Sequence, residues 1–223
     1  MSCRFKPKFI TFDAYGTLVD FQMSSVTRNL LSDQVGEDEM GEFLDDFEAY
    51  RMDEVLGAYK PYPQVIMDAL RRACQRRRVD YRESDGEEIV AAIPTWGPHA
   101  EVPDALNALA EHYRLVILSN AKDDQIKLNV EKLGAPFHAV FTAEQARGYK
   151  PQFRPFEYML EMLDCDQSEI LHVSASLWYD LIPAHHLRIT EKVYINRGYE
   201  PSTPFYGYTE LEDLSELPGL LLD

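Results

Sequence analysis

The sequence predicts an α/β fold, with a parallel sheet that helices cover on both faces and an inserted helical domain. Short apolar runs alternate with longer amphipathic segments over most of the 223 residues. This alternation is typical of buried parallel strands joined by helices. One long charged stretch interrupts it after the first run and shows only helical periodicity, which indicates the insertion.

The first predicted strand is "KFITFD", an apolar run over 8–13 that ends on a carboxylate. Further strands of this kind are predicted at 114–120, 139–144, 170–176 and 192–196. Amphipathic helices are predicted between the strands and at the end of the chain, at 102–113, 123–134, 153–164, 177–187 and 208–223. The strands carry apolar residues on both faces, so we expect helices on both sides of the sheet.

The interrupting stretch contains no convincing strand. Its apolar residues follow a helical period over 25–35, 40–56, 62–78 and 86–93. A connection of this length is too long for an ordinary loop, so we predict a helical domain over 21–97. The core domain is then formed by 1–20 and 98–223. The segment "PTWGPHAEVP", with three prolines, is the predicted return hinge.

Charge and cysteine content narrow the possible functions. The net charge of -16 argues against nucleic acid and anionic membrane as partners, because both attract basic surfaces. No apolar run reaches the roughly 20 residues that a membrane-spanning helix needs. The three cysteines, Cys3, Cys74 and Cys165, lie far apart and form no CxxC pair, so we expect reduced thiols in a cytoplasmic protein.

Polar residues follow four of the predicted strands at their carboxyl ends. Ligands of open α/β sheets bind in the crevice at that edge, so residues distant in sequence should converge there. These candidates are Asp13 after the first strand, Ser119 and Asn120 after the second, Lys150 after the third, and Ser174, Ser176 and Asp180 after the fourth.

The central pair is Asp13 and Lys150. A carboxylate in a closed cleft tends to protonate, and a cation about 4 Å away opposes this by roughly 4 kcal/mol at an effective dielectric of 20. Each residue also has a simpler reading. Asp13 fits a strand-end turn cap with Gly16 supplying the turn, Lys150 fits a solvated loop lysine, and Asp180 fits an acid in the first turn of a helix.

Four ordered segments resemble the haloacid dehalogenase superfamily, in its 2-haloacid dehalogenase (type II) branch. They are "FDAYGTLVD", "VILSN", "GYKPQFRPFEYML" and "ILHVSASLWYDLIPAHHL". The resemblance implies a Rossmann-like core with an α-helical cap domain. It also implies that Asp13 is the nucleophile, that Thr17 and Ser119 position it and the substrate, and that Lys150 holds its charge.

Two positions favour chemistry at carbon over phosphate hydrolysis. Phosphatases of this superfamily carry a proton-donating Asp where this chain has Tyr15, and a Mg²⁺-binding carboxylate where it has Ala175. The resemblance therefore implies a hydrolase of a small carboxylic acid that uses no cofactor, with Mg²⁺ as an open alternative. Asp13 would form an ester, and Asp180, with Ser176, would orient the water that hydrolyses it.

The remaining candidates would bind the substrate: Tyr15, Asn120, Ser174, Trp178 and Arg51. We expect a monomer or a homodimer. The chain departs from the branch at Phe156 and Ser176, where its members carry Tyr and Asn, and Arg51 does not clearly match their halide-binding arginine. The leaving group therefore stays open, and ring opening of L-azetidine-2-carboxylate is an alternative. A Mg²⁺-dependent phosphatase and a non-catalytic relative are the others.

Overall fold

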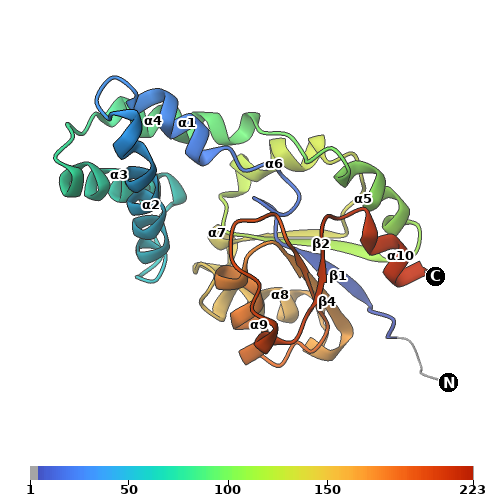
Figure 1. Cartoon of the computed structure of the whole chain (residues 1–223). Coiled ribbons are helices and arrows are strands. Elements are labelled where there is room, and N and C mark those ends of the chain that lie inside the picture. Colours follow the sequence, from blue (N-terminus) through green and yellow to red (C-terminus); the bar gives the residue numbers. More distant parts are fainter. Residues whose placement is uncertain (1–4, 223) are drawn as a thin grey trace.

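The computed structural model describes residues 5–222 and contains one six-stranded parallel sheet, which confirms the predicted fold class (Figure 1). The strand order is β3-β2-β1-β4-β5-β6. The strands are β1 (Phe9–Phe12), β2 (Arg114–Ser119), β3 (Ala139–Thr142), β4 (Ile170–Ser174), β5 (Lys192–Ile195) and β6 (Thr209–Leu211). Because β1 lies between β2 and β4, its carboxyl end is the middle of the binding edge.

The last strand corrects a prediction. The sequence suggested one closing helix over 208–223, but Thr209–Leu211 pairs with β5 in parallel, and helix α10 spans only Glu216–Leu222. Three residues are too few to show a strand period, and the pairing depends on a neighbour that is distant in the sequence.

Helices cover both faces of the sheet, as Figure 1 shows. Apolar residues of one face, such as Ile10 and Ile117, pack with helices α5 (Val102–Ala110), α6 (Asp123–Lys132) and α10. Residues of the opposite face, such as Phe9 and Val116, pack with α8 (Arg154–Leu163) and α9 (Ile182–His186). Successive strand residues point to opposite faces, so burial of both faces explains the continuous apolar runs.

A group of helices follows β1 and precedes α5, on one side of the sheet in Figure 1. These are α1 (Met23–Leu31), α2 (Glu37–Glu54), α3 (Tyr62–Arg77) and α4 (Glu83–Ala92). The chain enters and leaves the group through adjacent backbone segments, because Val19 forms an antiparallel bridge with Pro98. The Asp20 N–H also donates to the Gly97 carbonyl. The division into domains at 20 and 98 stays a prediction.

Arginines of α3 bind acidic residues of α2 and hold the two helices together. Arg72 pairs with Asp53 and Glu54, and Arg77 pairs with Asp46.

No helix within residues 5–222 is long and apolar enough to cross a membrane. Cys74 and Cys165 are free thiols, and Cys3 lies outside the described residues.

Candidate active site

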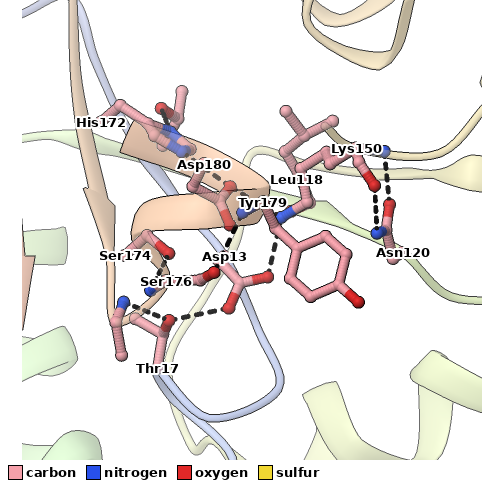
Figure 2. Close-up of polar contacts among 12 residues, drawn as sticks. Asp13, Thr17, Leu118, Asn120, Lys150, His172, Ser174, Ser176, Tyr179 and Asp180 are labelled. Atoms are coloured by element: carbon pink, nitrogen blue, oxygen red, sulfur yellow. Dashed lines mark hydrogen bonds and ion pairs between the residues drawn. The ribbon is translucent and has the colours of Figure 1, made fainter. Parts of the chain in front are cut away.

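Asp13 follows β1 directly and lies at the middle of the sheet edge, 8% exposed. Its backbone N–H donates to the Val173 carbonyl on β4. Gly16 has a φ of +90°, a conformation that favours glycine, and the chain turns there. The Thr17 hydroxyl then donates to Asp13 Oδ2 at 2.7 Å and accepts from the Ala175 N–H at 2.9 Å (Figure 2). One oxygen of Asp13 is thus fixed by its own turn.

Lys150 holds the other oxygen. Its ammonium is 1% exposed and donates to three acceptors, each at 2.8 Å: Asp13 Oδ1, Asp180 Oδ1 and the Leu118 carbonyl. All three ammonium protons are therefore used within the protein. The Asn120 amide fixes the lysine backbone by two hydrogen bonds of 2.8 Å, one to the Lys150 carbonyl and one from its N–H. These hydrogen bonds join three segments, which carry Asp13 after β1, Asn120 after β2 and Lys150 after β3.

Asp180 lies in a π-helical turn, Leu177–Leu181, and its side chain is fully buried. Its Oδ1 accepts from Lys150 and also from His172 Nε2 at 3.0 Å. Its Oδ2 is buried and has no hydrogen-bond partner within residues 5–222. Buried carboxylate oxygens are normally paired, so this oxygen is a candidate acceptor for a ligand or water.

The two carboxylates share Lys150, but their pKa values are shifted in opposite directions. Burial raises the pKa of Asp13, Lys150 opposes the rise, and the charge of Asp180 adds to it. Burial acts on Asp180 in the same direction, but Lys150 and His172 outweigh it and hold its pKa below the usual value. Burial lowers the pKa of Lys150, yet the two carboxylates raise it overall. Asp180 therefore ionises before Asp13, and Lys150 stays charged.

A cavity of about 200 Å³ opens above these groups, between the sheet edge and the helical group. This is smaller than the roughly 300–1,000 Å³ typical of pockets for drug-sized ligands, so a small molecule fits best. Asp13, Lys150 and Asp180 line one side of it. The opposite side comes from helices α1 to α3 and the segment after α2, through Ser24, Glu48, Arg51, Val55 and Tyr62.

Arg51 contributes a buried cation to this cavity. It is 8% exposed and continues the buried face of α2 formed by Met40, Phe43 and Phe47. Its guanidinium carbon lies 5.1 Å from the ring centre of Phe47 and 5.5 Å from that of Phe21. Within residues 5–222 its Nε is unpaired, and the residue forms no ion pair there. A buried cation without a carboxylate partner is suited to an anionic ligand.

Tyr15, Ser119 and Ser176 also line the cavity. The Tyr15 hydroxyl donates to Asn129 Oδ1 at 2.8 Å and is therefore bound to helix α6. Burial raises the pKa of Tyr15 well above its usual value, so this phenol is a poor acid. The Ser119 hydroxyl is buried and unpaired within the described chain, so it is available to a ligand.

Ser176 is engaged by a residue that the sequence analysis did not identify. Its hydroxyl donates to Glu200 Oε1 at 2.8 Å, and the other oxygen of Glu200 accepts from the Trp178 N–H. Ser174 and Trp178 do not line the cavity. Ser174 accepts a hydrogen bond from the Ser176 N–H, and the Trp178 side chain is partly exposed.

Two acidic cavity residues were not among the sequence candidates: Glu48 and Glu200. Glu48 and Glu200 were two of 38 acidic residues, and no local pattern distinguished them. His172, which binds Asp180 outside the cavity, did carry a signal. It is a polar residue inside a predicted buried strand, and such residues are normally paired with another polar group.

The chain is similar to known hydrolases over most of its length. The family model of the haloacid dehalogenase-like hydrolases matches residues 7–187. Among curated proteins, the chain is 29% identical to (S)-2-haloacid dehalogenase 4A of Burkholderia cepacia, over 94% of this chain and 93% of that protein. It is 26% identical to (S)-2-haloacid dehalogenase H-109 of Pseudomonas putida, over 96% and 97%.

Solved structures show the same fold. A dehalogenase crystallised as an intermediate complex has a TM-score of 0.83 and 24% identity, and the match covers 98% of this chain and 99% of that one. L-2-haloacid dehalogenase from Xanthobacter autotrophicus, with chloropropionic acid covalently bound, has a TM-score of 0.78 and 20% identity, over 97% and 99%.

Proposed function

The chain belongs to the haloacid dehalogenase-like hydrolases, and from this premise we propose that it hydrolyses a small 2-substituted carboxylic acid at carbon. The names of its relatives support (S)-2-haloacids as the substrate class. The observation that carries the proposal is the geometry of one ammonium, Lys150, which donates at 2.8 Å to both Asp13 and Asp180 at the edge of the cavity. The arrangement supplies a nucleophile and a base.

In the first step, a carboxylate oxygen of Asp13 attacks carbon 2 of the substrate. A carbon–oxygen bond forms, the carbon–halogen bond breaks, and the halide leaves with the electron pair of that bond. A halide needs no proton to leave, so the engagement of the Tyr15 hydroxyl by Asn129 is no obstacle. Lys150 and the Thr17 hydroxyl hold the carboxylate for in-line attack.

In the second step, water attacks the carboxyl carbon of the Asp13 ester. Asp180 accepts a proton from this water through its unpaired Oδ2. The ester bond breaks, the 2-hydroxy acid leaves with one oxygen from Asp13 and takes the proton held by Asp180, and the water oxygen restores the carboxylate as its second proton passes to solvent. Once Asp13 is esterified it carries no charge, so Lys150 can stabilise the oxyanion that forms on the ester carbonyl.

The other cavity groups support binding of an anionic substrate. The unpaired hydroxyl of Ser119 can donate to the substrate carboxylate, and Arg51 supplies a buried positive charge for the carboxylate or the departing halide. Asn120 acts on the lysine backbone, so we assign it a positioning role rather than the substrate contact expected from the sequence.

A Mg²⁺-dependent phosphatase is the less favoured alternative. Both oxygens of Asp13 accept hydrogen bonds, from Thr17 and Lys150, and only Oδ2 of Asp180 is unpaired within the described chain, so the two carboxylates offer a single unpaired oxygen to a divalent cation that prefers several. We therefore propose that no metal ion takes part, and that EDTA leaves turnover of a 2-haloacid unchanged. Turnover of a phosphomonoester that requires Mg²⁺ would contradict this assignment. A cytoplasmic location and a monomeric or homodimeric state stay predictions.

The direct test is isotopic. The protein is incubated in ¹⁸O water with a panel of (S)-2-haloacids and L-azetidine-2-carboxylate, and the peptide that contains Asp13 is analysed by mass spectrometry. Label in Asp13 after one turnover supports the ester mechanism. Label that enters the product directly would contradict it, and consumption of the azetidine alone would reassign the leaving group. Asp13→Ala, which lacks the nucleophile, is the control.

A further inference from the structure

His172 is a fully buried histidine on β4 that the two steps above do not use. It lies opposite Thr11 of β1 in the parallel register. The ring of Phe156 on α8 packs against it edge-on, with the ring centres 5.3 Å apart. A polar ring at the centre of a sheet is costly unless both nitrogens are satisfied, so its partners indicate its role.

Both ring nitrogens have a partner. Nε2 lies 3.0 Å from Asp180 Oδ1, and Nδ1 lies 2.8 Å from Thr11 Oγ1. An ionised carboxylate only accepts, so Nε2 carries a proton and donates it to Asp180. The Thr11 hydroxyl can donate to Nδ1, or it can accept from Nδ1–H and donate to the Leu171 carbonyl at 3.3 Å. The orientation of the ring is therefore fixed in either protonation state.

The His172 ring determines which oxygen of Asp180 lacks a hydrogen-bond partner in the described part of the chain. His172 and Lys150 approach the same atom, Oδ1, from two different segments of the chain. Two donors on one oxygen fix the rotation of the carboxylate, whereas Lys150 alone would leave the carboxylate free to turn about its bond to Cβ. Oδ2 is consequently held without a partner among the described residues.

We propose that His172 is a positioning residue for the second half-reaction, which fixes Asp180 so that Oδ2 meets the hydrolytic water. This inference rests on the proposed function, because it concerns hydrolysis of the ester on Asp13. His172 does not line the cavity, so it acts through Asp180 and leaves formation of the ester largely unaffected.

Four variants test the positioning role of His172, and two of them introduce amide side chains of different length. The amide nitrogen of Gln can occupy the position of Nε2, so His172→Gln retains the donor to Asp180. The shorter amide in His172→Asn reaches only the position of Nδ1, beside Thr11. His172→Phe keeps a ring and has no donor. Thr11→Val, which leaves the imidazole in place, is the milder fourth variant.

The measurement separates the two steps by rapid quenching and intact-protein mass spectrometry, with the 2-haloacid that the wild-type protein consumes. In His172→Asn and His172→Phe we expect ester hydrolysis to slow by roughly 10- to 100-fold, as for loss of a hydrogen bond to a buried carboxylate. Ester then accumulates on Asp13. His172→Gln should hydrolyse it near the wild-type rate, and Thr11→Val should lose roughly 2- to 10-fold.

Equal effects in the Gln and Asn variants would overturn the inference, and so would a proportional loss of both steps, which indicates a merely structural role. An unchanged ratio of the two rates in Thr11→Val and His172→Phe would also overturn it. Absence of any Asp13 ester or label in the wild-type protein refutes the proposed function itself, and the inference with it. The wild-type experiment therefore distinguishes the two failures.

Discussion

Replacement of Lys150 by methionine removes the cation but keeps a side chain of similar length in a fully buried position. At 2.8 Å and an effective dielectric of 20, the attraction between Lys150 and Asp13 is about 6 kcal/mol. Relaxation of the surrounding residues offsets part of the lost attraction. The negative charge of Asp180, however, then acts on Asp13 without the opposing charge of Lys150. We expect the pKa of Asp13 to rise further above its usual value.

The sign of the effect on activity follows from the nucleophile. Asp13 attacks only as a carboxylate, so ester formation falls as pH drops through its pKa, which burial already raises in the native protein. In Lys150→Met the acid limb of this rate should therefore move to higher pH. Part of the lost activity should return at alkaline pH. The assay is ester formation on Asp13, followed by quenched mass spectrometry from about pH 4 to pH 10.

Two controls accompany the measurement. Lys150→Arg keeps the charge, so its acid limb should move less than that of the methionine variant. Lys127→Met makes the same substitution at an exposed lysine and should leave the profile unchanged. Thermal unfolding by circular dichroism establishes that the variants are folded over this pH range. A uniform loss of rate at every pH, with the acid limb unmoved, would refute the electrostatic reasoning.

Three other substitutions probe the remaining contacts. Asp180→Asn should form the ester and then retain it, visible as a lasting mass increase on Asp13; rapid loss of the ester would exclude Asp180 as the base. Arg51→Met should raise KM by roughly 10- to 100-fold with a smaller effect on kcat, because a buried cation for an anionic ligand is lost. The exposed Arg76→Met is its control, and equal KM values would remove Arg51 from the binding site. Asn120→Leu removes two hydrogen bonds to the backbone of Lys150. It should lower the free energy of unfolding by about 1–3 kcal/mol, measured by urea unfolding, and should also lower kcat, measured by steady-state kinetics. Unchanged values in both assays would contradict a positioning role.

The sequence predicted which residues gather at the sheet edge because parallel strands leave little freedom there. Once 8–13 and 114–120 are strands of one parallel sheet, their carboxyl ends lie at the same edge, and Asp13 and Ser119 line one cavity. The contact between Lys150 and Asp13, 137 residues apart, follows from the same topology together with the loop after β3. Local periodicity, which predicts the parallel strands and their carboxyl ends, was sufficient for this part.

Other cavity residues depend on tertiary contacts that the local pattern does not contain. Glu200 reaches Ser176 from a loop after β5, and nothing in its neighbourhood fixes the path of that loop. Arg51 does carry a signal in the sequence, because it extends the buried stripe of Met40 and Phe47 at helical spacing. The sequence shows that this face is buried, but the cavity against which it packs is known only from the structure.

The pairing of Val19 with Pro98 has a consequence for how this enzyme family can diversify. The covalent connections of helices α1 to α4 to the rest of the chain are these two adjacent crossings, so the group forms a cassette, a segment that can be exchanged as one unit. Arg51 and Glu48 belong to the cassette, whereas Asp13 and Lys150 do not. Exchange of the helices between relatives would therefore change which acid is accepted while the reacting groups are inherited intact.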